Sequence, residues 1–559
     1  MDFSVFSQYL QKLEAIASRN EMTVVLAQMF AEASAEDARL ISYLCQGKLG
    51  PAYKSPDFGI ADKSMVKALG PEAEKLFKQK GDLGLVAQEL NTGKGKMSVK
   101  QVYDKLWEIA TISGTGSQDK KQQLIINLLA EVDPVSAKYI VKMILGKLRT
   151  GFSDMTILDS LSWMLSGNKK LKPQIESMYN VRADLGEIAE MVKNSKNQKL
   201  KNSKISPEIG TPILMAKCER AVTTFDIWER LDKCAVEYKL DGLRIQAHIN
   251  KTVTLFSRGL ENVTSMYPDI CEGLARQIKH NCIVEGEMIA LDKNGRFLPF
   301  QETVQRKRKY DILEMLESVP LKIFLFDVLL LDGSNVINEA NETRRKLLES
   351  IVIPGDTVKL MIRNKIEKEI EIEEFFQESL KAGTEGIIAK KLDGGYAAGA
   401  RDFNWIKYKK SYQQSALSDT LDVVVMGYDE GQGKRSKFGI GDFLAGVYDP
   451  ESEKYFTIAK VGTGLTDKEW IELRSMIYEL RTKNKPENYE VSNQMKCDHW
   501  VEPKVVVELL ADEITKSPMH TSGYALRFPR LVSFREKKPT DATSMKELEK
   551  MVKLQKDRR

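Results

Sequence analysis

The sequence has no long hydrophobic run and few residues suited to disulfide or zinc chemistry. No apolar stretch approaches the roughly 18 consecutive residues that a membrane-spanning helix needs. The amino-terminal segment lacks the basic stretch followed by an apolar stretch that marks a secretory signal. The six cysteines include no CxxC pair, and only four histidines are present. We therefore expect no structural zinc site, no membrane association and a cytoplasmic location with reduced thiols.

The chain also lacks a large net charge of either sign. The chain carries 84 basic and 79 acidic residues, a net charge of +5, which is too small to indicate nucleic-acid binding by itself. Two basic runs stand out, at residues 193–204 and 306–309. Each is compatible with a solvated linker or helix end. Phosphate neutralisation is the alternative, and the sequence leaves both interpretations open.

The length predicts several domains, because single hydrophobic cores stop growing near about 250–300 residues and this chain has 559. Residues 1–205 carry apolar side chains at three- and four-residue spacing, as in 122–132 and 137–148, which indicates helices. Asp133 followed by Pro134 is typical of a helix start. The pattern predicts an all-α domain over this range.

The pattern changes at about residue 206. Short alternating segments, which indicate strands, are interrupted by helical segments up to residue 412, and this mixture predicts an α+β domain. Strand-like runs separated by turn residues dominate residues 413–559 and predict a small β-barrel with a basic, helical tail. The predicted fold is therefore multidomain.

The segment Glu237–Gly242 places charged side chains in a pattern that can support nucleophilic chemistry. Alternation along a strand puts Glu237, Lys239 and Asp241 on one face. A lysine between two carboxylates is ordinarily a structural ion pair. It becomes a nucleophile only as the neutral amine, which flanking carboxylates disfavour and a metal ion or burial would promote. This segment alone does not decide between the two interpretations.

Three later segments contain groups that a nucleotide pocket needs. Arg258 follows a strand and offers a guanidinium suited to phosphate or ribose. Glu285 and Glu287 share a strand face with apolar residues, which indicates partial burial and favours a metal or hydroxyl partner over the alternative of a solvent-facing edge. Phe324 and Phe326 alternate onto one face, where one ring would pack in the core and the other would stack on a base.

Two further segments suggest contacts to an anion. Glu385 precedes a glycine, where backbone can approach a ligand. Lys407 and Lys409 share one strand face, and like charges so placed destabilise a strand unless an anion lies between them. A triphosphate fits, and a solvated edge strand is the alternative. A basic cluster near the C-terminus comprises Arg527, Arg530 and Arg535–Lys538. It would also contact an anion, and an ordinary solvent-exposed surface patch is the alternative.

Taken in order, these segments resemble the motifs of covalent nucleotidyltransferases. EYKLDGLR at 237–244 resembles the KxDGxR motif that carries the nucleophilic lysine. SRGLEN, VEGE, FLFD, EGIIAK and WIKYKK resemble the five motifs that follow it, and RFPRLVSFREKK resembles the last. One KxDG is a weak signal, whereas the full series between residues 237 and 538 is specific.

The amino-terminal region narrows the resemblance. Segments 113–120 and 146–151 resemble the helical DNA-binding domain of three-domain ATP-dependent DNA ligases, most closely the archaeal-type replicative form. The resemblance implies a monomer with a DNA-binding domain, an adenylation domain and an OB-fold. It also implies an enzyme that uses ATP and Mg²⁺ to seal nicks in duplex DNA through a lysyl-AMP intermediate, in replication, repair and recombination.

The resemblance assigns roles to individual residues. Lys239 would carry AMP, and Glu287 and Glu385 would associate with Mg²⁺. The remaining nucleotide contacts, of which the last three would orient pyrophosphate, would be Glu237, Arg244, Arg258, Phe326, Lys390, Lys407, Lys409, Arg527, Arg530 and Lys538. The expected contacts to DNA phosphates are Thr115, Ser117 and Arg149.

The sequence departs from the family pattern at two places. Residues 93–98 lack the two aromatics of the sliding-clamp peptide that archaeal relatives often carry there, which puts clamp binding in doubt. Gly259 stands where many relatives have asparagine, which would alter one ribose or backbone contact. The cysteine cluster of NAD-dependent ligases is missing, which favours ATP.

Two other functions fit part of this pattern. An RNA ligase or a capping-type nucleotidyltransferase would also use KxDG but would not explain the amino-terminal helices. A non-catalytic DNA clamp would show damage to the lysine or a carboxylate, and the sequence shows none.

The expected grip on the DNA backbone generates a first prediction. Binding of a nicked duplex should weaken steeply as salt rises, because contacts to phosphates release condensed counterions. Fluorescence anisotropy of a labelled duplex across a salt series would measure it. An affinity that hardly changes with salt would contradict backbone binding.

Overall fold

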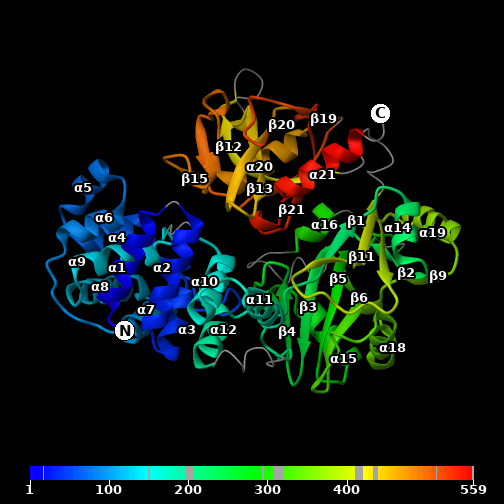
Figure 1. The fold of residues 1–559 in the computed structure, drawn as a ribbon, viewed down its shortest axis with the longest axis horizontal. Coiled ribbons are helices and arrows are strands. Elements are labelled where there is room, and N and C mark those ends of the chain that lie inside the picture. Colours follow the sequence, from blue (N-terminus) through cyan, green and yellow to red (C-terminus); the bar gives the residue numbers. More distant parts are fainter. Residues whose placement is uncertain are drawn as a thin grey trace. The chain divides into compact units, whose positions relative to one another are not determined.

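A computed structural model describes residues 1–16, 18–148, 152–195, 205–292, 295–298, 300–306, 316, 319–409, 420–431, 438–511 and 513–556. Its contacts divide the chain into two units. Unit 1 comprises residues 1–214 and 260–262, and unit 2 comprises residues 215–259 and 263–559. Figure 1 colours the helices of unit 1 from blue to cyan and most of unit 2 from green to red. The predicted boundary at 412 falls outside the described residues.

Unit 1 is built from helices whose apolar faces meet in one core, with Phe3, Phe6 and Phe30 fully buried in it. Asp133 accepts hydrogen bonds from the backbone amides of Val135 and Ser136, which confirms the predicted helix start. The helices are α1 (Phe3–Glu14), α2 (Arg19–Glu32), α3 (Ala35–Leu44), α4 (Asp62–Leu69), α5 (Ala73–Lys80), α6 (Leu83–Leu90), α7 (Val99–Thr111), α8 (Ser117–Ala130), α9 (Pro134–Ile144), α10 (Asp154–Ser166), α11 (Lys172–Val181) and α12 (Leu185–Asn194).

The first part of unit 2 contains two sheets. One has the strand order β1-β11-β10-β2-β9, and the other has the order β4-β3-β5-β6-β7 with β8 beside β6. The strands are β1 (Lys217–Arg220), β2 (Cys234–Lys239), β3 (Leu243–Ile249), β4 (Val253–Ser257), β5 (Cys282–Ala290), β6 (Leu321–Leu331), β7 (Ser334–Asn335), β8 (Val358–Leu360), β9 (Arg363–Ile366), β10 (Gly386–Lys391) and β11 (Arg401–Lys409). The helices are α14 (Thr224–Leu231), α15 (Pro268–Gln277), α16 (Phe300–Val304), α18 (Asn341–Ile351) and α19 (Glu369–Lys381).

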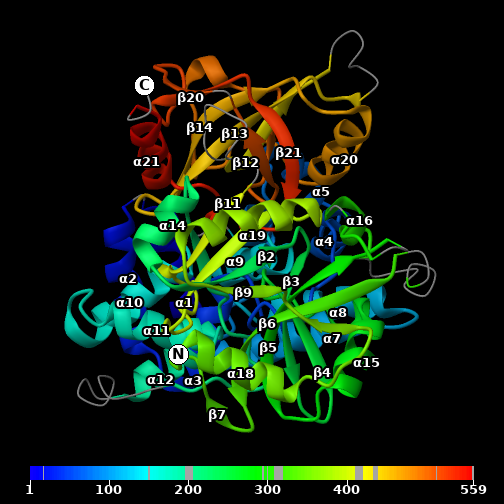
Figure 2. The same cartoon turned by 90° about the vertical axis from the view of Figure 1, so that its right-hand side faces the viewer.

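Helix α19 covers one face of the first sheet, as Figure 2 shows. The ring of Tyr238 lies 5.2 Å from that of Phe375, and the ring of Tyr408 lies 4.5 Å from that of Phe376. Because successive strand side chains point to opposite faces, the residues flanking these two tyrosines project from the other face. The predicted site residues of β2 and β11 are those flanking residues.

The last part of unit 2 is rich in strands. The described residues form a sheet of order β15-β17-β12-β13-β14-β16, in which β18 pairs with β12 and β21, and a separate β19-β20 pair. The strands are β12 (Leu421–Asp429), β13 (Asp442–Asp449), β14 (Lys454–Val461), β15 (Arg481–Thr482), β16 (Tyr489–Glu490), β17 (His499–Val501), β18 (Val506–Leu510), β19 (Glu513–Lys516), β20 (Tyr524–Arg527) and β21 (Arg530–Arg535).

Two helices accompany this sheet. The helical tail is confirmed as α21 (Met545–Lys556). Helix α20 (Asp467–Tyr478) was not predicted, and it buries Trp470, Leu473 and Ile477. In the described part of the chain, no helix is long and apolar enough to span a membrane.

The backbone of β10 at Gly386 lies very close to the backbone of β11, and this close approach is the basis of the second prediction. A Cβ atom placed there would lie 2.1 Å from the carbonyl oxygen of Tyr408. Gly386→Ala should therefore destabilise the fold by about 1–3 kcal/mol, since backbone cannot yield as a side chain can. Gly395→Ala is the matched control, because its Cβ would meet nothing closer than 3.5 Å. Urea unfolding would measure both, and equal stability of the two variants would contradict the prediction.

Candidate functional site

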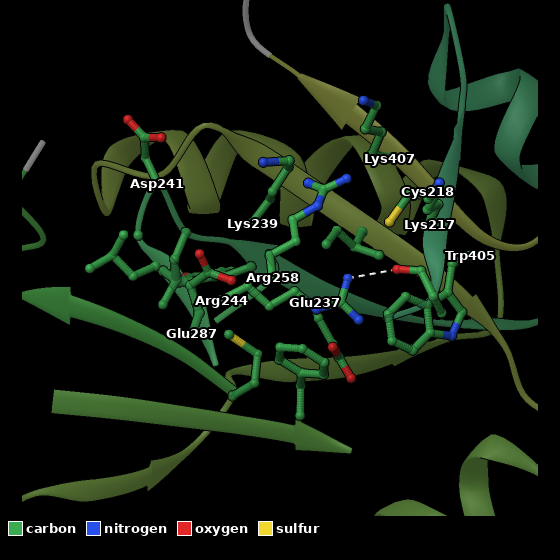
Figure 3. Close-up of a pocket in the computed structure, with 18 of the residues that line it drawn as sticks. Lys217, Cys218, Glu237, Lys239, Asp241, Arg244, Arg258, Glu287, Trp405 and Lys407 are labelled. Atoms are coloured by element: carbon green, nitrogen blue, oxygen red, sulfur yellow. Dashed lines mark hydrogen bonds between the residues drawn. The ribbon is translucent and has the colours of Figure 1, made fainter. Parts of the chain in front are cut away.

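Unit 2 contains a cavity of about 180 Å³, lined by several strands and by the segment Phe534–Lys537. Figure 3 shows part of its lining, including Glu237, Lys239 and Arg258. Most of the predicted nucleotide contacts line it. These are Glu237, Lys239, Arg244, Arg258, Glu287, Phe326, Lys390 and Lys407. Phe324 does not line the cavity and instead lies 5.5 Å from the ring of Phe297. Of the two phenylalanines, only Phe326 is thus placed to meet a ligand.

Strand register explains why remote residues converge here. Lys239 in β2 pairs with Gly386 in β10, which pairs with Lys409 in β11. Paired residues of neighbouring antiparallel strands project from the same face, so Lys239 and Lys409 lie on one side of the sheet. Strand β11 lies between β1 and β10, so the alternative of a solvated edge strand for Lys407 and Lys409 is excluded.

Three cations gather around Glu385. The ammonium of Lys239 contacts one carboxylate oxygen of Glu385. Lys409 Nζ lies 3.6 Å and Arg535 Nη1 3.5 Å from the other oxygen. Burial by itself would raise the pKa of Glu385, but these three cations hold it well below its ordinary value. Glu385 is therefore ionised and fixes the position of the Lys239 ammonium.

The C-terminal part of unit 2 contributes groups that the sequence did not single out. Arg535 and Lys537 line the cavity. Glu508 lies 3.1 Å from Lys409 Nζ and 3.4 Å from Arg535 Nη1, and these cations outweigh burial to lower the pKa of Glu508 to about 2. Asp422 contacts Lys537, whose pKa burial lowers to about 7. The sequence signal was the basic cluster Arg535–Lys538, which did not indicate which of its members point inward.

Three predicted pyrophosphate contacts do not reach the cavity. Arg527, Arg530 and Lys538 are not among the residues that line it, and Arg527 and Arg530 are exposed. Both arginines flank the turn between β20 and β21. Of the segment that includes β20 and β21, only the residues at and just after the end of β21 line the cavity. Arg535 and Lys537 therefore line it, whereas Arg527 and Arg530 do not.

The opposite end of the cavity combines aromatic rings with a buried ion pair. Lys390 Nζ lies 2.7 Å from an oxygen of Glu237, and both side chains are at most 3% exposed. The same ammonium lies 4.6 Å from the ring centroid of Phe326 and 4.2 Å from that of Trp405. Burial lowers the pKa of Lys390 although Glu237 opposes that shift. Lys390 is thus a cavity residue and lies beside Glu237.

Arg244 is held rigidly at the same end. Its Nη2 lies 2.7 Å from the fully buried Glu285, and its Nη1 donates to the carbonyl oxygen of Ala216 at 2.7 Å, drawn dashed in Figure 3. The guanidinium lies 5.4 Å from the ring centroids of Phe326 and Trp405. Glu285 thus serves as the partner of Arg244, whereas Glu287 lines the cavity.

Two cavity carboxyl groups resist ionisation. Burial raises the pKa of Glu287 to about 7, against the opposing pull of Lys239 and Arg244. Burial and then the nearby Glu385 raise the pKa of Asp241 to about 6. Within the described ranges, no three His, Cys, Asp or Glu side chains are grouped to hold a metal by themselves. Mg²⁺ needs only one or two carboxylates beside substrate phosphates, so these carboxyl groups fit that cation.

The remaining predicted residues lie in other places. Thr115 is exposed between two glycines with positive φ, and Ser117 is the first residue of α8. Arg149 and residues 307–309 lie outside the described residues. Arg306 is buried and pairs with Asp269 at 2.8 Å, so this member of the second basic run has a structural role.

The cavity therefore pairs a cationic end with an aromatic, acidic end, which suits the phosphates and base of a nucleotide. Family models match along the chain: "DNA ligase N terminus" at residues 2–162, "ATP dependent DNA ligase domain" at 212–409 and "ATP dependent DNA ligase C terminal region" at 436–538. The chain is 42% identical to a "Probable DNA ligase" of Dictyoglomus turgidum, over 100% of this chain and 98% of the relative.

A second relative, a "DNA ligase" of Sulfolobus acidocaldarius, is 37% identical over 99% of this chain and 98% of its own length. The chain belongs to the ATP-dependent DNA ligase family. Membership implies an enzyme that uses ATP and acts on nicked DNA. It also disfavours the RNA ligase and capping alternatives, because the match extends over the amino-terminal helices that they left unexplained.

The raised pKa of Glu287 generates the third prediction. A carboxyl group whose pKa is higher in the folded than in the unfolded protein opposes folding once it ionises. The penalty is absent below its ordinary pKa and complete above about 7. Without nucleotide or metal, Glu287→Gln should stabilise the protein by on the order of 1–3 kcal/mol near pH ~8, with no gain near pH ~4.

Thermal unfolding of the variant and the wild type at both pH values would measure the effect. Exposed Glu487, changed to Gln, is the control and should give no such pH-dependent gain. A Glu287→Gln variant that is equally or less stable at high pH would show that the carboxylate is not penalised there.

Proposed function

We propose that Lys239 is the nucleophile of the ligase reaction and that AMP is carried on its Nζ. The carrying observation is the contact between Lys239 and Glu385 at the centre of the cationic end of the cavity. The Lys239 ammonium would first give a proton to solvent. The neutral Nζ would then form a bond to the α-phosphorus of ATP while the bond from that phosphorus to the bridging oxygen breaks, so that pyrophosphate leaves with that oxygen and Nζ gives up a second proton to solvent. Glu385 orients the ammonium until the nucleotide arrives.

Two further transfers would complete the reaction. AMP would pass from Lys239 to the 5′-phosphate of the nick, freeing the lysine. The 3′-hydroxyl would then attack the activated phosphate, seal the strand and release AMP. Such steps depend on positioning and charge neutralisation, which the fixed cations of this cavity supply.

The nucleotide would lie with its base at the aromatic end. Phe326 would stack on the base, and Glu237 would accept from the adenine amino group, with Lys390 beside it. Arg244 and Arg258 would hold ribose or phosphate, and Lys407 and Lys409 the α-phosphate. Arg535 and Lys537 line the cavity and would be the main contacts to pyrophosphate. Arg527, Arg530 and Lys538 would contact pyrophosphate only in a different conformation of the protein.

Glu287 and Glu385 are the residues we propose to associate with Mg²⁺. When bound, the cation would screen the phosphate charges. The pKa of Glu287, raised by burial, supports this assignment, because a cation would relieve the cost of ionising it.

We also propose a role for each region. The helical part up to about residue 205 would bind DNA, with Thr115, Ser117 and Arg149 on phosphates. Residues 206–412 would be the adenylation domain, and the strand-rich remainder an OB-fold. The protein would act as a cytoplasmic monomer in replication, repair and recombination. Clamp binding lacks its usual peptide at residues 93–98.

Transfer of label from α-labelled ATP tests the proposal as the fourth prediction. The wild type should retain label after denaturation and seal a nicked duplex. Lys239→Ala should lose both, because no other group replaces the amine. Lys391→Ala is the control: this lysine is in the neighbouring strand β10, is 46% exposed and pairs with Asp393.

The outcomes separate the alternatives. Labelling followed by sealing of RNA alone would keep the chemistry and reject the DNA substrate. A wild type that takes no label, even after pyrophosphate treatment to remove AMP already bound, would reject the covalent mechanism and favour a non-catalytic clamp. Label retained by Lys239→Ala would assign the nucleophile elsewhere.

A further inference from the structure

Three buried polar atoms at or beside the aromatic end of the cavity have no hydrogen-bond partner within the described part of the chain. One is Nε of Arg244, and the other two are Oε1 of Glu237 and Nη1 of Arg363, which lie 3.9 Å apart. The side chains of Glu237 and Arg363 are 3% and 10% exposed. Buried polar groups are normally paired, and an unpaired donor beside an unpaired acceptor calls for an explanation. A bound molecule that presents one of each would provide it.

Strand register places Arg363 beside Glu237, which lines the cavity, whereas Arg363 itself lies behind the lining residues. Glu237 in β2 pairs with Arg363 in β9 on one side and with Ile388 in β10 on the other. The side chains of all three therefore project from the same face. Glu237, Ile388 and Met361, which precedes β9, all line the cavity. A planar base between Phe326 and Ile388 would present its edge to Glu237 and Arg363.

Lys390 and Glu237 already form an ion pair at this edge. Lys390 holds the other oxygen of Glu237 at 2.7 Å, which leaves Oε1 as the free acceptor. A carboxylate only accepts hydrogen bonds, and a guanidinium only donates them. Adenine matches this pair, because its exocyclic amine donates while the adjacent ring nitrogen N1 accepts. Hypoxanthine and guanine reverse both groups.

We infer that Arg363 is a specificity-determining residue that donates a hydrogen bond to N1 of adenine, beside the Glu237 contact to the amine. The inference rests on the proposed nucleotide-binding mode. On this inference, Glu237 and Arg363 together prevent the binding of 6-oxopurine nucleotides. A 6-oxopurine would set its N1–H against Arg363 and its O6 against Glu237, leaving buried groups unpaired.

Label transfer from ATP and from 1-deaza-ATP, in which a C–H replaces N1, tests the inference as the fifth prediction. The amine is retained, so only the N1 contact is lost. The wild type should prefer ATP by about 10- to 100-fold in the ratio of rate to KM, the range expected for a hydrogen bond to a charged group. In Arg363→Met the ratio of rate to KM for ATP should fall to the value for 1-deaza-ATP, so that the variant no longer prefers ATP.

Arg345→Met is the matched control. Arg345 pairs with Glu349 at 2.7 Å and donates to the carbonyl oxygen of Met361 at 3.1 Å, so its loss removes a nearby guanidinium without removing the proposed donor. It should retain the preference for ATP. Arg363→Lys keeps the charge, and its shorter side chain should restore part of the preference at most.

Each result decides the matter. A wild type that uses both nucleotides equally would overturn the inference without any variant, even if Arg363→Met failed to fold. A preference that persists in Arg363→Met, with both nucleotides used less well, would show that Arg363 has only a structural role. A wild type that takes no label from ATP would instead reject the proposed function, which is a different outcome.

Discussion

The neutralisation of Glu385 is the constraint on which the cationic end of the cavity depends. A buried carboxylate is costly unless cations compensate it, and Lys239, Lys409 and Arg535 all do so. These cations come from β2, β11 and β21, so one side chain links three separate segments of the chain. The close approach of β10 to β11 at Gly386 brings Lys409 within reach.

The two ends of the cavity differ in their charge and in their aromatic content. Cations dominate around Lys239, where phosphate charge would be neutralised. At the other end Lys390 is paired with Glu237 and enclosed by Phe326 and Trp405, so its charge is already compensated. A triphosphate therefore gains more at the first end, while a base gains stacking and edge contacts at the second.

Local sequence patterns predicted much of the site because strand alternation is a local property. The pattern around Lys239 correctly predicted β2, and Lys407 and Lys409 correctly shared a face of β11. Alternation could not show that Glu285 would hold Arg244, or that Lys537 rather than Lys538 would line the cavity. Helix α20 was missed because strand-like segments on both sides of it dominate the hydrophobic pattern.

Four features can be predicted from the sequence: the helical character of the amino-terminal part, the strands of unit 2, eight of the residues that line the cavity, and the family to which the chain belongs. These follow from periodicities and spacings within short segments. Only the tertiary structure decided the pairing of Glu237 with Arg363 and Lys390, and the convergence of Arg535 and Glu508 on Lys409. Such contacts depend on the register between strands far apart in the chain, which is set by the packing of whole sheets and leaves no local trace in the sequence.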